Sequence, residues 1–351
     1  MITESYTESR KKSVSLFRKI QENPGKYISI SGDRPTGALH LGHFFGVLQN
    51  RLILQSVGVK SFILIADYQF YTDRKCTNPQ EIEQNIQDIL LDYLAVGIEP
   101  GKNMIIFNHS NIPELNQLML PFLSLVTVSD LNRNPTVKEE IKFLKDVTGA
   151  MLTYPVHQAA DILFCKANVV PIGKDQLSHL ELARKISRKF NNYYGKTFPL
   201  PCGLLSESPI ILGVDGKKKM SKSQKNAIYI KSTEEETASL IMSARTDSFP
   251  YVSYNPEERP EISNLLLLYC LCTNLDPKVV ADSIGEKGAY YLKRMLVDAL
   301  NDFFLPIRRK RMQLKKDLGY VLEVIQNGNK MAREEAINTL EEVNIKMGLV
   351  I

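Results

Sequence analysis

The sequence has 351 residues, enough for one large domain with a buried core and a smaller second domain. Its 44 Lys and Arg residues against 39 Asp and Glu residues give a formal net charge of +5, which excludes a general polyanion-coating protein and leaves room only for a local nucleic-acid site. Five cysteines at irregular spacing favour reduced thiols over a disulfide framework. Cys270 and Cys272 lie in an apolar run and are expected to be buried structural thiols.

The sequence contains no run of roughly 18 to 20 apolar residues and no apolar signal core near its start. We therefore expect a cytoplasmic protein with no membrane association. Residues 10–20 are basic and weakly amphipathic, but Glu4 and Glu8 argue against a transit sequence. Residues 1–26 are therefore predicted to be an N-terminal extension that carries an extra surface helix.

Short β-rich runs alternate with helical runs over the first 190 residues. Strands are predicted at residues 27–31, 61–67, 104–108 and 168–172, with helices from about residue 41 and at residues 79–96, 113–125 and 176–190. This alternation predicts a parallel α/β sheet, in which ligands gather at the carboxyl ends of the strands. Residues 194–218 are rich in Pro, Gly and Ser and are predicted to be a surface connector.

Helices dominate the last third of the chain. Ser232 and Glu235 form a predicted capping box, and helices are expected at residues 237–245, 261–271, 277–284, 287–305 and 333–347. The fold class is therefore α/β with a helical carboxyl-terminal domain, whose last helix could pack back on the first domain.

The first segment that carries chemistry spans residues 31–43, SGDRPTGALHLGH. It follows a predicted strand and opens a helix, where backbone N–H groups and the helix dipole favour an anion such as a nucleotide phosphate. His40 and His43 can donate to phosphate oxygens, and Gly42 would let an adenine ring approach the backbone. Two histidines at this spacing are more often surface or capping residues, but the strand and glycine context favours a nucleotide.

The second segment spans residues 217–223, KKKMSKS. A lysine run alone usually indicates a solvated loop or a localisation patch. Here it lies in a Gly-rich connector, where a lysine could swing onto a pyrophosphate and stabilise the charge of the transition state.

Together the two segments resemble the HLGH and KMSKS motifs of the class I aminoacyl-tRNA synthetases, whose catalytic domain is a Rossmann-type sheet. The resemblance implies ATP binding with Mg²⁺, attack of an amino-acid carboxylate on the α-phosphorus, release of pyrophosphate, and transfer of the amino acid to tRNA. It also implies a catalytic domain at residues 27–230 and a helical anticodon-binding domain at residues 231–351.

The resemblance assigns site residues by position. Catalytic roles are implied for His40, His43, Lys219 and Lys222. Contacts with ATP are implied for Arg34, Pro35, Thr36, Gly42, His43, Gly173, Lys174, Asp175, Ile210, Lys219, Met220, Ser221, Lys222 and Ser223. Lys138 aligns with a family lysine near the phosphates, although an exposed helix lysine is nearly as good an interpretation.

Residues 153–163, TYPVHQAADIL, place Tyr154, Gln158 and Asp161 on one face of a helix by their i, i+4, i+7 spacing. A carboxylate buried without a partner is costly, so Asp161 either pairs inside the protein or accepts a hydrogen bond from a ligand. Under the ligand interpretation Asp161 accepts from an indole N–H or a phenol O–H, while Tyr154 and Gln158 hold the α-amino group. By resemblance, Gln176 lies beside Asp161.

Within the class, the chain is most similar to the tryptophan-specific enzymes, over nearly its whole length after residue 26. This similarity implies L-tryptophan, ATP and tRNA(Trp) as partners and a homodimeric state. Gln158, however, stands where many tryptophan enzymes carry methionine, and the Tyr-x₃-Gln-x₂-Asp array also occurs in tyrosine-specific members. The alternatives are a tyrosine enzyme, a non-catalytic paralogue that binds tRNA or an amino acid, and another nucleotidyltransferase with the HxGH turn.

The densest basic cluster is Arg308-Arg309-Lys310-Arg311, followed by Lys315 and Lys316. An amphipathic helix that turns its charges to solvent explains such a cluster without any function. A basic helical face also suits contacts with tRNA phosphates.

Overall fold

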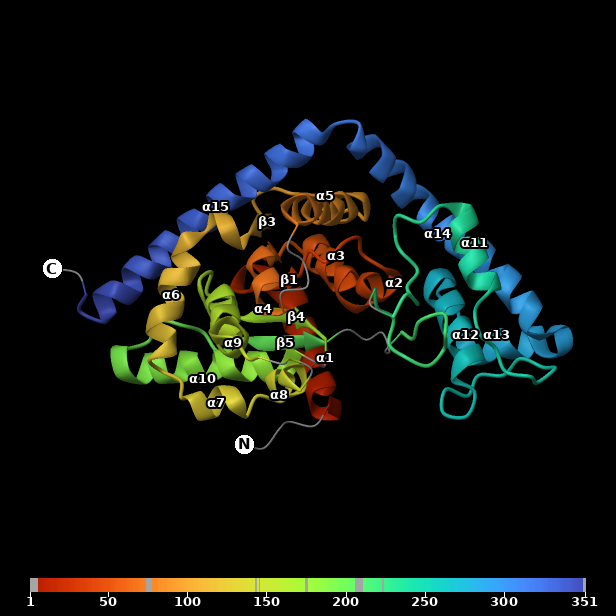
Figure 1. Cartoon of the computed structure of the whole chain (residues 1–351), viewed down its shortest axis with the longest axis horizontal. Helices are drawn as coiled ribbons and strands as arrows, with labels where there is room; N and C mark the ends of the chain where they lie inside the picture. The colour runs from red at the N-terminus through yellow and green to blue at the C-terminus, as the bar shows by residue number, and fades with distance from the viewer. Residues whose placement is uncertain are drawn as a thin grey trace.

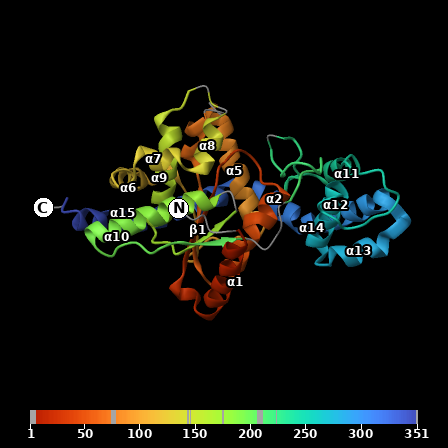
Figure 2. The same cartoon turned by 90° about the horizontal axis from the view of Figure 1, so that it is seen from below.

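A computed structural model describes residues 6–73, 78–142, 144, 146–173, 176–205, 211–222 and 224–349. An α/β lobe holds a five-stranded sheet, and a helical lobe extends away from it, joined through the long helix α14 (Figures 1 and 2). Within the described part of the chain, no helix is both long and apolar enough to cross a membrane.

The sheet is parallel, with the strand order β3-β2-β1-β4-β5. Its strands are β1 (Ile28–Asp33), β2 (Lys60–Ile65), β3 (Met104–Asn108), β4 (Val169–Ile172) and β5 (Cys202–Leu205). The first four were predicted, and the predicted fold class is confirmed. The prediction that residues 194–218 form only a surface connector is wrong, because this segment contains β5, which pairs with β4. The strand has only four residues and lies just after prolines, so no alternation identified it.

The helices of the α/β lobe cover both faces of this sheet. They are α2 (Leu41–His43), the π-helical η2 (Phe44–Leu48), α3 (Gln49–Ser56), α4 (Phe70–Asp73), α5 (Pro79–Ala95), α6 (Pro113–Leu123), α7 (Val128–Asn132), α8 (Pro135–Ile141), α9 (Gly149–Leu163) and α10 (Leu177–Tyr194). Alternate residues of β2 enter two different cores: Ile63 packs with α5 and the helical lobe, and Phe62 packs with α9 and α10. Burial on both faces explains the apolar runs in β2, β3 and β4.

The helical lobe contains α11 (Glu234–Met242), α12 (Pro260–Thr273), α13 (Pro277–Ile284) and α14 (Gly288–Lys315), and α15 (Leu318–Lys346) follows it. The predicted capping box is wrong by one residue: Thr233 caps α11, and Glu236 completes the box. Helix α14 also continues past the predicted end, through Pro306. Cys270 and Cys272 are free thiols on α12, the first buried and the second half-buried.

Helix α15 returns across the α/β lobe and lies against β3 and α6 (Figure 1). Contact with the strand is closest at Gly328, where a Cβ atom would stand 1.8 Å from the carbonyl oxygen of Ile106. Next to it, Asn329 Oδ1 accepts a hydrogen bond from the backbone N–H of Asn108 at 3.0 Å. A glycine at this position therefore lets a helix backbone approach a strand backbone directly.

At the other end of the sheet, α1 (Tyr6–Glu22) packs on β5, which confirms the predicted amino-terminal helix. Ser13 Oγ accepts from the N–H of Leu205 at 3.0 Å and donates to the carbonyl oxygen of Gly203 at 3.3 Å. Ile20 is fully buried against the sheet. The helix is therefore fixed to the edge strand by both polar and apolar contacts.

Candidate active site

The HLGH segment lies at the carboxyl end of β1, where the strand ends at Asp33 and α2 begins at Leu41. The N–H of His40 donates to His43 Nδ1 at 3.2 Å, which places the ring proton of neutral His43 on Nε2. Burial lowers the pKa of His40 to about 2 and that of His43 to about 4. Both rings are therefore neutral at pH 7, and His43 offers an N–H donor.

A buried group of charged and polar side chains holds the end of β1, from which the HLGH segment starts. Arg51 lies 2.8 Å from Asp33 Oδ2, and its Nε donates to Ser31 Oγ at 2.7 Å. The hydroxyl of Tyr93 donates to the same carboxylate at 2.6 Å. Burial raises the pKa of Asp33, but Arg51 and the other partners lower it further, so Asp33 stays ionised. These contacts fix the end of β1 from which the segment starts.

Gly42 also makes room for protein neighbours. A Cβ atom at this position would lie 3.1 Å from the Nδ1 and Cε1 atoms of His40 and 3.6 Å from the Cβ of Met220. The missing side chain therefore accommodates the His40 ring and the KMSKS segment.

The KMSKS segment forms an anchored hairpin. Met220 is buried, and its N–H donates to the carbonyl oxygen of Ile211 at 3.0 Å. Asn226 Oδ1 accepts from the N–H of Ser221 at 2.9 Å, and Asn226 Nδ2 donates to Asp215 at 3.2 Å. Lys219 is exposed and faces Leu212 across the hairpin. The predicted mobile connector is therefore held at its base, with lysine side chains at its surface.

The two segments meet. The N–H of Leu41 donates to the carbonyl oxygen of Ile228 at 2.8 Å, and the N–H of Ile230 donates to the carbonyl oxygen of Leu39 at 3.0 Å. The ammonium group of Lys222 donates to the carbonyl oxygen of Gly37 and lies 3.4 Å from Thr36 Oγ1. Burial lowers the pKa of Lys222 to about 8. Hydrogen bonds thus join the HLGH segment to Lys222, 185 positions away from Gly37 in the chain, and to the residues that follow the KMSKS segment.

Helix α9 places Asp161 beside a buried histidine. Asp161 is 3% exposed, and its Oδ2 lies 3.0 Å from His109 Nε2. On the other side of the ring, His109 Nδ1 lies 3.8 Å from Asp67 Oδ1. Burial alone would lower the pKa of His109, but Asp161 and, after it, Asp67 raise it above its ordinary value. The sequence allowed Asp161 either a partner inside the protein or a ligand. Inside the protein, its partner is His109.

The other predicted amino-acid residues lie on the same helix or next to it. The hydroxyl of Tyr154 donates to Glu140 at 2.8 Å and lies 3.2 Å from His179 Nε2. Gln158 Nε2 donates to Gln176 Oε1 at 3.3 Å. The structure thus brings Gln176 to Gln158.

Arg34 directly follows β1, and its guanidinium donates to the carbonyl oxygen of Gln69 at 3.0 Å. Burial and Glu140 raise the pKa of Tyr154, and the charge of Arg34 lowers it in part. Gly173 directly follows β4. Lys138 is exposed on α8. Four predicted ATP contacts, Lys174, Asp175, Ile210 and Ser223, lie outside the described residues.

Several residues of the site were missed from the sequence. Asp67 lies two residues after the end of β2, and His109 follows β3 directly, so the rule that ligands gather at the carboxyl ends of parallel strands could have identified both. His157, on α9, lies 3.7 Å from Asp161 Oδ1. Ligand atoms of His109, His157 and Asp161 all lie within 4.8 Å of one another, close enough to hold a divalent cation. The ring of His109 lies between the carboxylates of Asp161 and Asp67, so ion pairing inside the protein is also open to this cluster.

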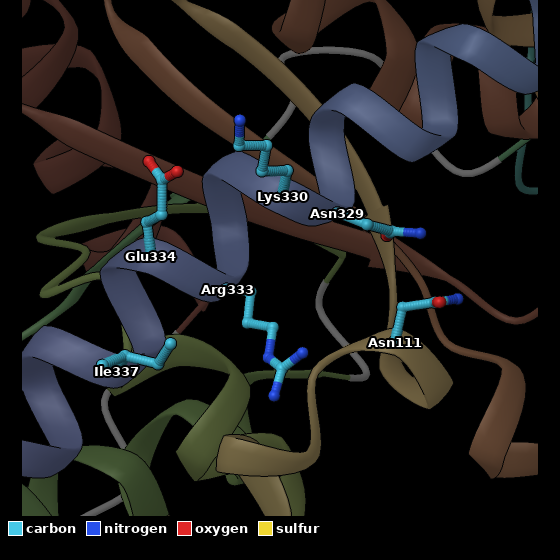
Figure 3. A pocket seen from close by; sticks show the side chains of 6 residues that line it. All are labelled: Asn111, Asn329, Lys330, Arg333, Glu334 and Ile337. Carbon is cyan, nitrogen blue, oxygen red and sulfur yellow. The ribbon is translucent and has the colours of Figure 1, made fainter.

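A hollow of about 340 Å³ lies away from these segments, along α15 (Figure 3). It is lined by Asn111, Asn329, Lys330, Arg333, Glu334 and Ile337. Arg333 is already paired with Glu114 at 2.9 Å. None of the predicted site residues that the structure describes is among the residues that line the hollow.

The basic cluster on α14 is divided between the surface and the interior. Arg308 donates to the carbonyl oxygen of Ser232 at 2.7 Å and to Thr237 Oγ1 at 2.8 Å, and Arg311 is buried against carboxylates of α5. Arg309 and Lys310 are exposed. Only part of the cluster is therefore available to a polyanion.

The fold and the paired segments are those of a class I aminoacyl-tRNA synthetase. The family described as tRNA synthetases class I (W and Y) matches residues 22–304, and the chain belongs to this family. It is an aminoacyl-tRNA ligase, as predicted. The chain is 42% identical over 337 residues to the tryptophan--tRNA ligase of Clostridium longisporum, covering 92% of this chain and 97% of that one.

Two solved structures are similar over the same length. The tryptophanyl-tRNA synthetase of Mycoplasma pneumoniae has a TM-score of 0.80 at 26% identity, covering 92% of this chain and 98% of that one. The tryptophanyl-tRNA synthetase of Campylobacter jejuni, complexed with ADP and tryptophan, has a TM-score of 0.79 at 28% identity, covering 92% and 99%. The predicted resemblance to the tryptophan-specific members is confirmed.

Proposed function

We propose that this protein uses ATP to convert L-tryptophan to tryptophanyl-adenylate and transfers the tryptophanyl group to tRNA(Trp), releasing AMP and pyrophosphate. The observation that carries the proposal is the junction of the HLGH and KMSKS segments at the carboxyl end of β1, beside the helix that bears Asp161. ATP enters as its Mg²⁺ complex. The cytoplasmic location and the homodimeric state are parts of the same proposal, as is the division into domains at residues 27–230 and 231–351.

The HLGH side of the site binds the triphosphate with neutral donors and with backbone. His43 presents its Nε2–H because Nδ1 is occupied by the N–H of His40. The neutral imidazole of His43 already carries this proton at pH 7, so it need neither gain nor lose a proton when the phosphate binds. Arg34 supplies a fixed positive charge near Tyr154 on α9, where the tryptophan carboxylate must meet the α-phosphorus.

The KMSKS side stabilises the leaving pyrophosphate. Lys222 already contacts the backbone of the opposite segment, and a triphosphate placed between them offers its ammonium group a stronger acceptor. Lys219, exposed at the hairpin, reaches the same space. Stabilisation of charge that develops in the transition state contributes about 3 to 4 kcal/mol for one well-placed donor.

Asp161 selects the side chain of the substrate. One of its oxygens is engaged by His109, and the other is available to accept the indole N–H. A pocket that hydrogen-bonds its substrate rejects an analogue without that group by about 10⁴ to 10⁵, so phenylalanine is excluded. Identity of 42% with a tryptophan--tRNA ligase favours indole over phenol.

ATP–pyrophosphate exchange measured with each amino acid separately tests the proposal. We expect exchange with tryptophan and at least a hundredfold less with tyrosine, followed by charging of tRNA(Trp) when tRNA is added. Exchange with tyrosine but not tryptophan would replace the proposal by the tyrosine enzyme. If purified protein with ATP and Mg²⁺ formed no adenylate with any amino acid, a non-catalytic binding protein would be the better interpretation.

A further inference from the structure

Helix α5 places a buried carboxylate between the HLGH segment and the helical lobe. Asp92 is 0% exposed, and its Oδ2 accepts the backbone N–H of Leu39, next to His40, at 2.8 Å. Its Oδ1 accepts from Arg311 Nε of α14 at 2.7 Å. One side chain of α5 therefore joins the ATP-binding backbone to a helix of the other lobe.

A second carboxylate, one helical turn earlier, extends the connection to the KMSKS side. Asp88 Oδ1 accepts from the Nη2 of Arg311 at 2.6 Å, and Asp88 Oδ2 accepts from Lys231 Nζ at 2.9 Å. Lys231 follows Ile230, whose N–H donates to the carbonyl oxygen of Leu39. The contacts therefore form a closed ring that includes the backbone of Leu39, in the HLGH segment, and of Ile230, seven residues after the KMSKS segment ends at residue 223.

The two parts of this ring differ in strength. Lys231 is exposed, so its pair with Asp88 contributes little. Arg311 and Asp92 are buried, and removing one partner leaves a buried charge without compensation. A buried ion pair adds little stability relative to apolar packing of the same volume, but it permits only one arrangement of the groups it joins. What Arg311 contributes is therefore a fixed geometry.

We propose that Arg311 is a positioning residue for adenylate formation: through Asp92 and Asp88 it holds the HLGH segment and residues 230–231, which follow the KMSKS segment, in the arrangement that ATP requires. The proposal rests on the proposed function of the site. Because Arg311 belongs to α14, it also makes the ATP site sensitive to the position of the helical lobe. A misplacement of about 1 Å in such a site can cost a hundredfold in rate.

The test compares Arg311→Met with Arg259→Met. Arg259 is also a buried arginine of the helical lobe, paired with Asp247 at 2.7 Å, but none of its contacts reaches an ATP-binding segment. For Arg311→Met we expect kcat/KM for ATP in the exchange reaction to fall at least tenfold, while KM for tryptophan changes less than twofold. Arg259→Met should leave KM for ATP within twofold of the wild type. Arg311→Lys should recover part of the loss, because it keeps the charge but not the two-carboxylate contact.

Two further measurements make the result decisive. If Arg311→Met does not fold, Asp92→Asn replaces it, since the variant keeps an acceptor for Leu39 but loses the charge that binds Arg311. The rise in melting temperature caused by ATP alone is also compared, which requires no amino acid. A wild type that is stabilised by ATP but exchanges with no amino acid would contradict the proposed function only. A folded Arg311→Met or Asp92→Asn variant with wild-type kcat/KM for ATP would overturn the role of Arg311.

Discussion

Substitution of Asp161 by Asn separates the charge of this residue from its shape. The carboxylate is buried, with one oxygen 3.0 Å from His109 Nε2. Asn keeps the volume and one carbonyl oxygen for the indole N–H, but it removes the negative charge. A hydrogen bond to a charged group contributes about 1.5 to 3 kcal/mol and a neutral one about 0.5 to 1.5 kcal/mol. The expected loss in tryptophan binding is therefore about 1 to 1.5 kcal/mol, a five- to tenfold increase in KM.

The assay is ATP–pyrophosphate exchange, with tryptophan and ATP varied in separate series. We expect the increase in KM for tryptophan and no more than a twofold change in KM for ATP. The matched control is Glu114→Gln, because Glu114 is also a buried carboxylate, paired with Arg333 outside the site. A folded Asp161→Asn variant with an unchanged KM for tryptophan would refute the reasoning and return Asp161 to a purely structural role. An equal increase in the control would refute it as well.

Three further outcomes follow from the structure. Gly328→Ala should lower the free energy of unfolding in urea by about 1 to 3 kcal/mol, because its methyl group would overlap the backbone of Ile106; an unchanged midpoint would contradict the close approach. At pH 8, ATP binding should be accompanied by the uptake of about half a proton, because Lys222 has a pKa of about 8 and a bound phosphate raises this pKa. Calorimetry in two buffers should detect the uptake, and Lys222→Met should abolish it. His109→Gln should destabilise the protein by about 1 to 3 kcal/mol at pH 6 and by less at pH 9. Because the pKa of His109 is raised in the folded protein, its contribution to stability is complete below its ordinary pKa and is lost as the pH rises through the raised value. Equal losses at both pH values would show that the charge of His109 does not matter.

The sequence predicts the fold less well where a segment is too short to show a clear pattern. Strands β2, β3 and β4 are mainly apolar because both of their faces are buried, so composition identified them. In β1, isoleucine alternates with serine. The four residues of β5 are partly exposed and carry no such signal. Ser232 with Glu235 and Thr233 with Glu236 satisfy the same capping pattern, and only packing selects the second pair. The helix was predicted to end at residue 305, just before Pro306. Helix α14 instead continues to Lys315, because the helical turns on both sides of Pro306 compensate for the hydrogen bond that proline cannot donate.

In the candidate site, sequence motifs identified residues that are neighbours in the chain and missed the groups that hold them. HLGH and KMSKS are contiguous, so their spacing was readable. The partners of Asp33, Asp92 and Asp161 lie between 18 and 219 positions away in the chain. Such pairings depend on which helices the tertiary fold brings together, and composition does not encode them. The residues that position the chemistry are therefore less visible in the sequence than those that perform it.

The two outer strands of the sheet are covered by opposite ends of the chain, α1 on β5 and α15 on β3. During synthesis α1 is available before β5 emerges from the ribosome, whereas β3 must wait for residues 318–346. Until then its outer backbone groups are open to pairing with another chain. A protein cut before residue 318 would keep both ATP-binding segments, and we expect it to fail by self-association rather than by loss of its chemistry.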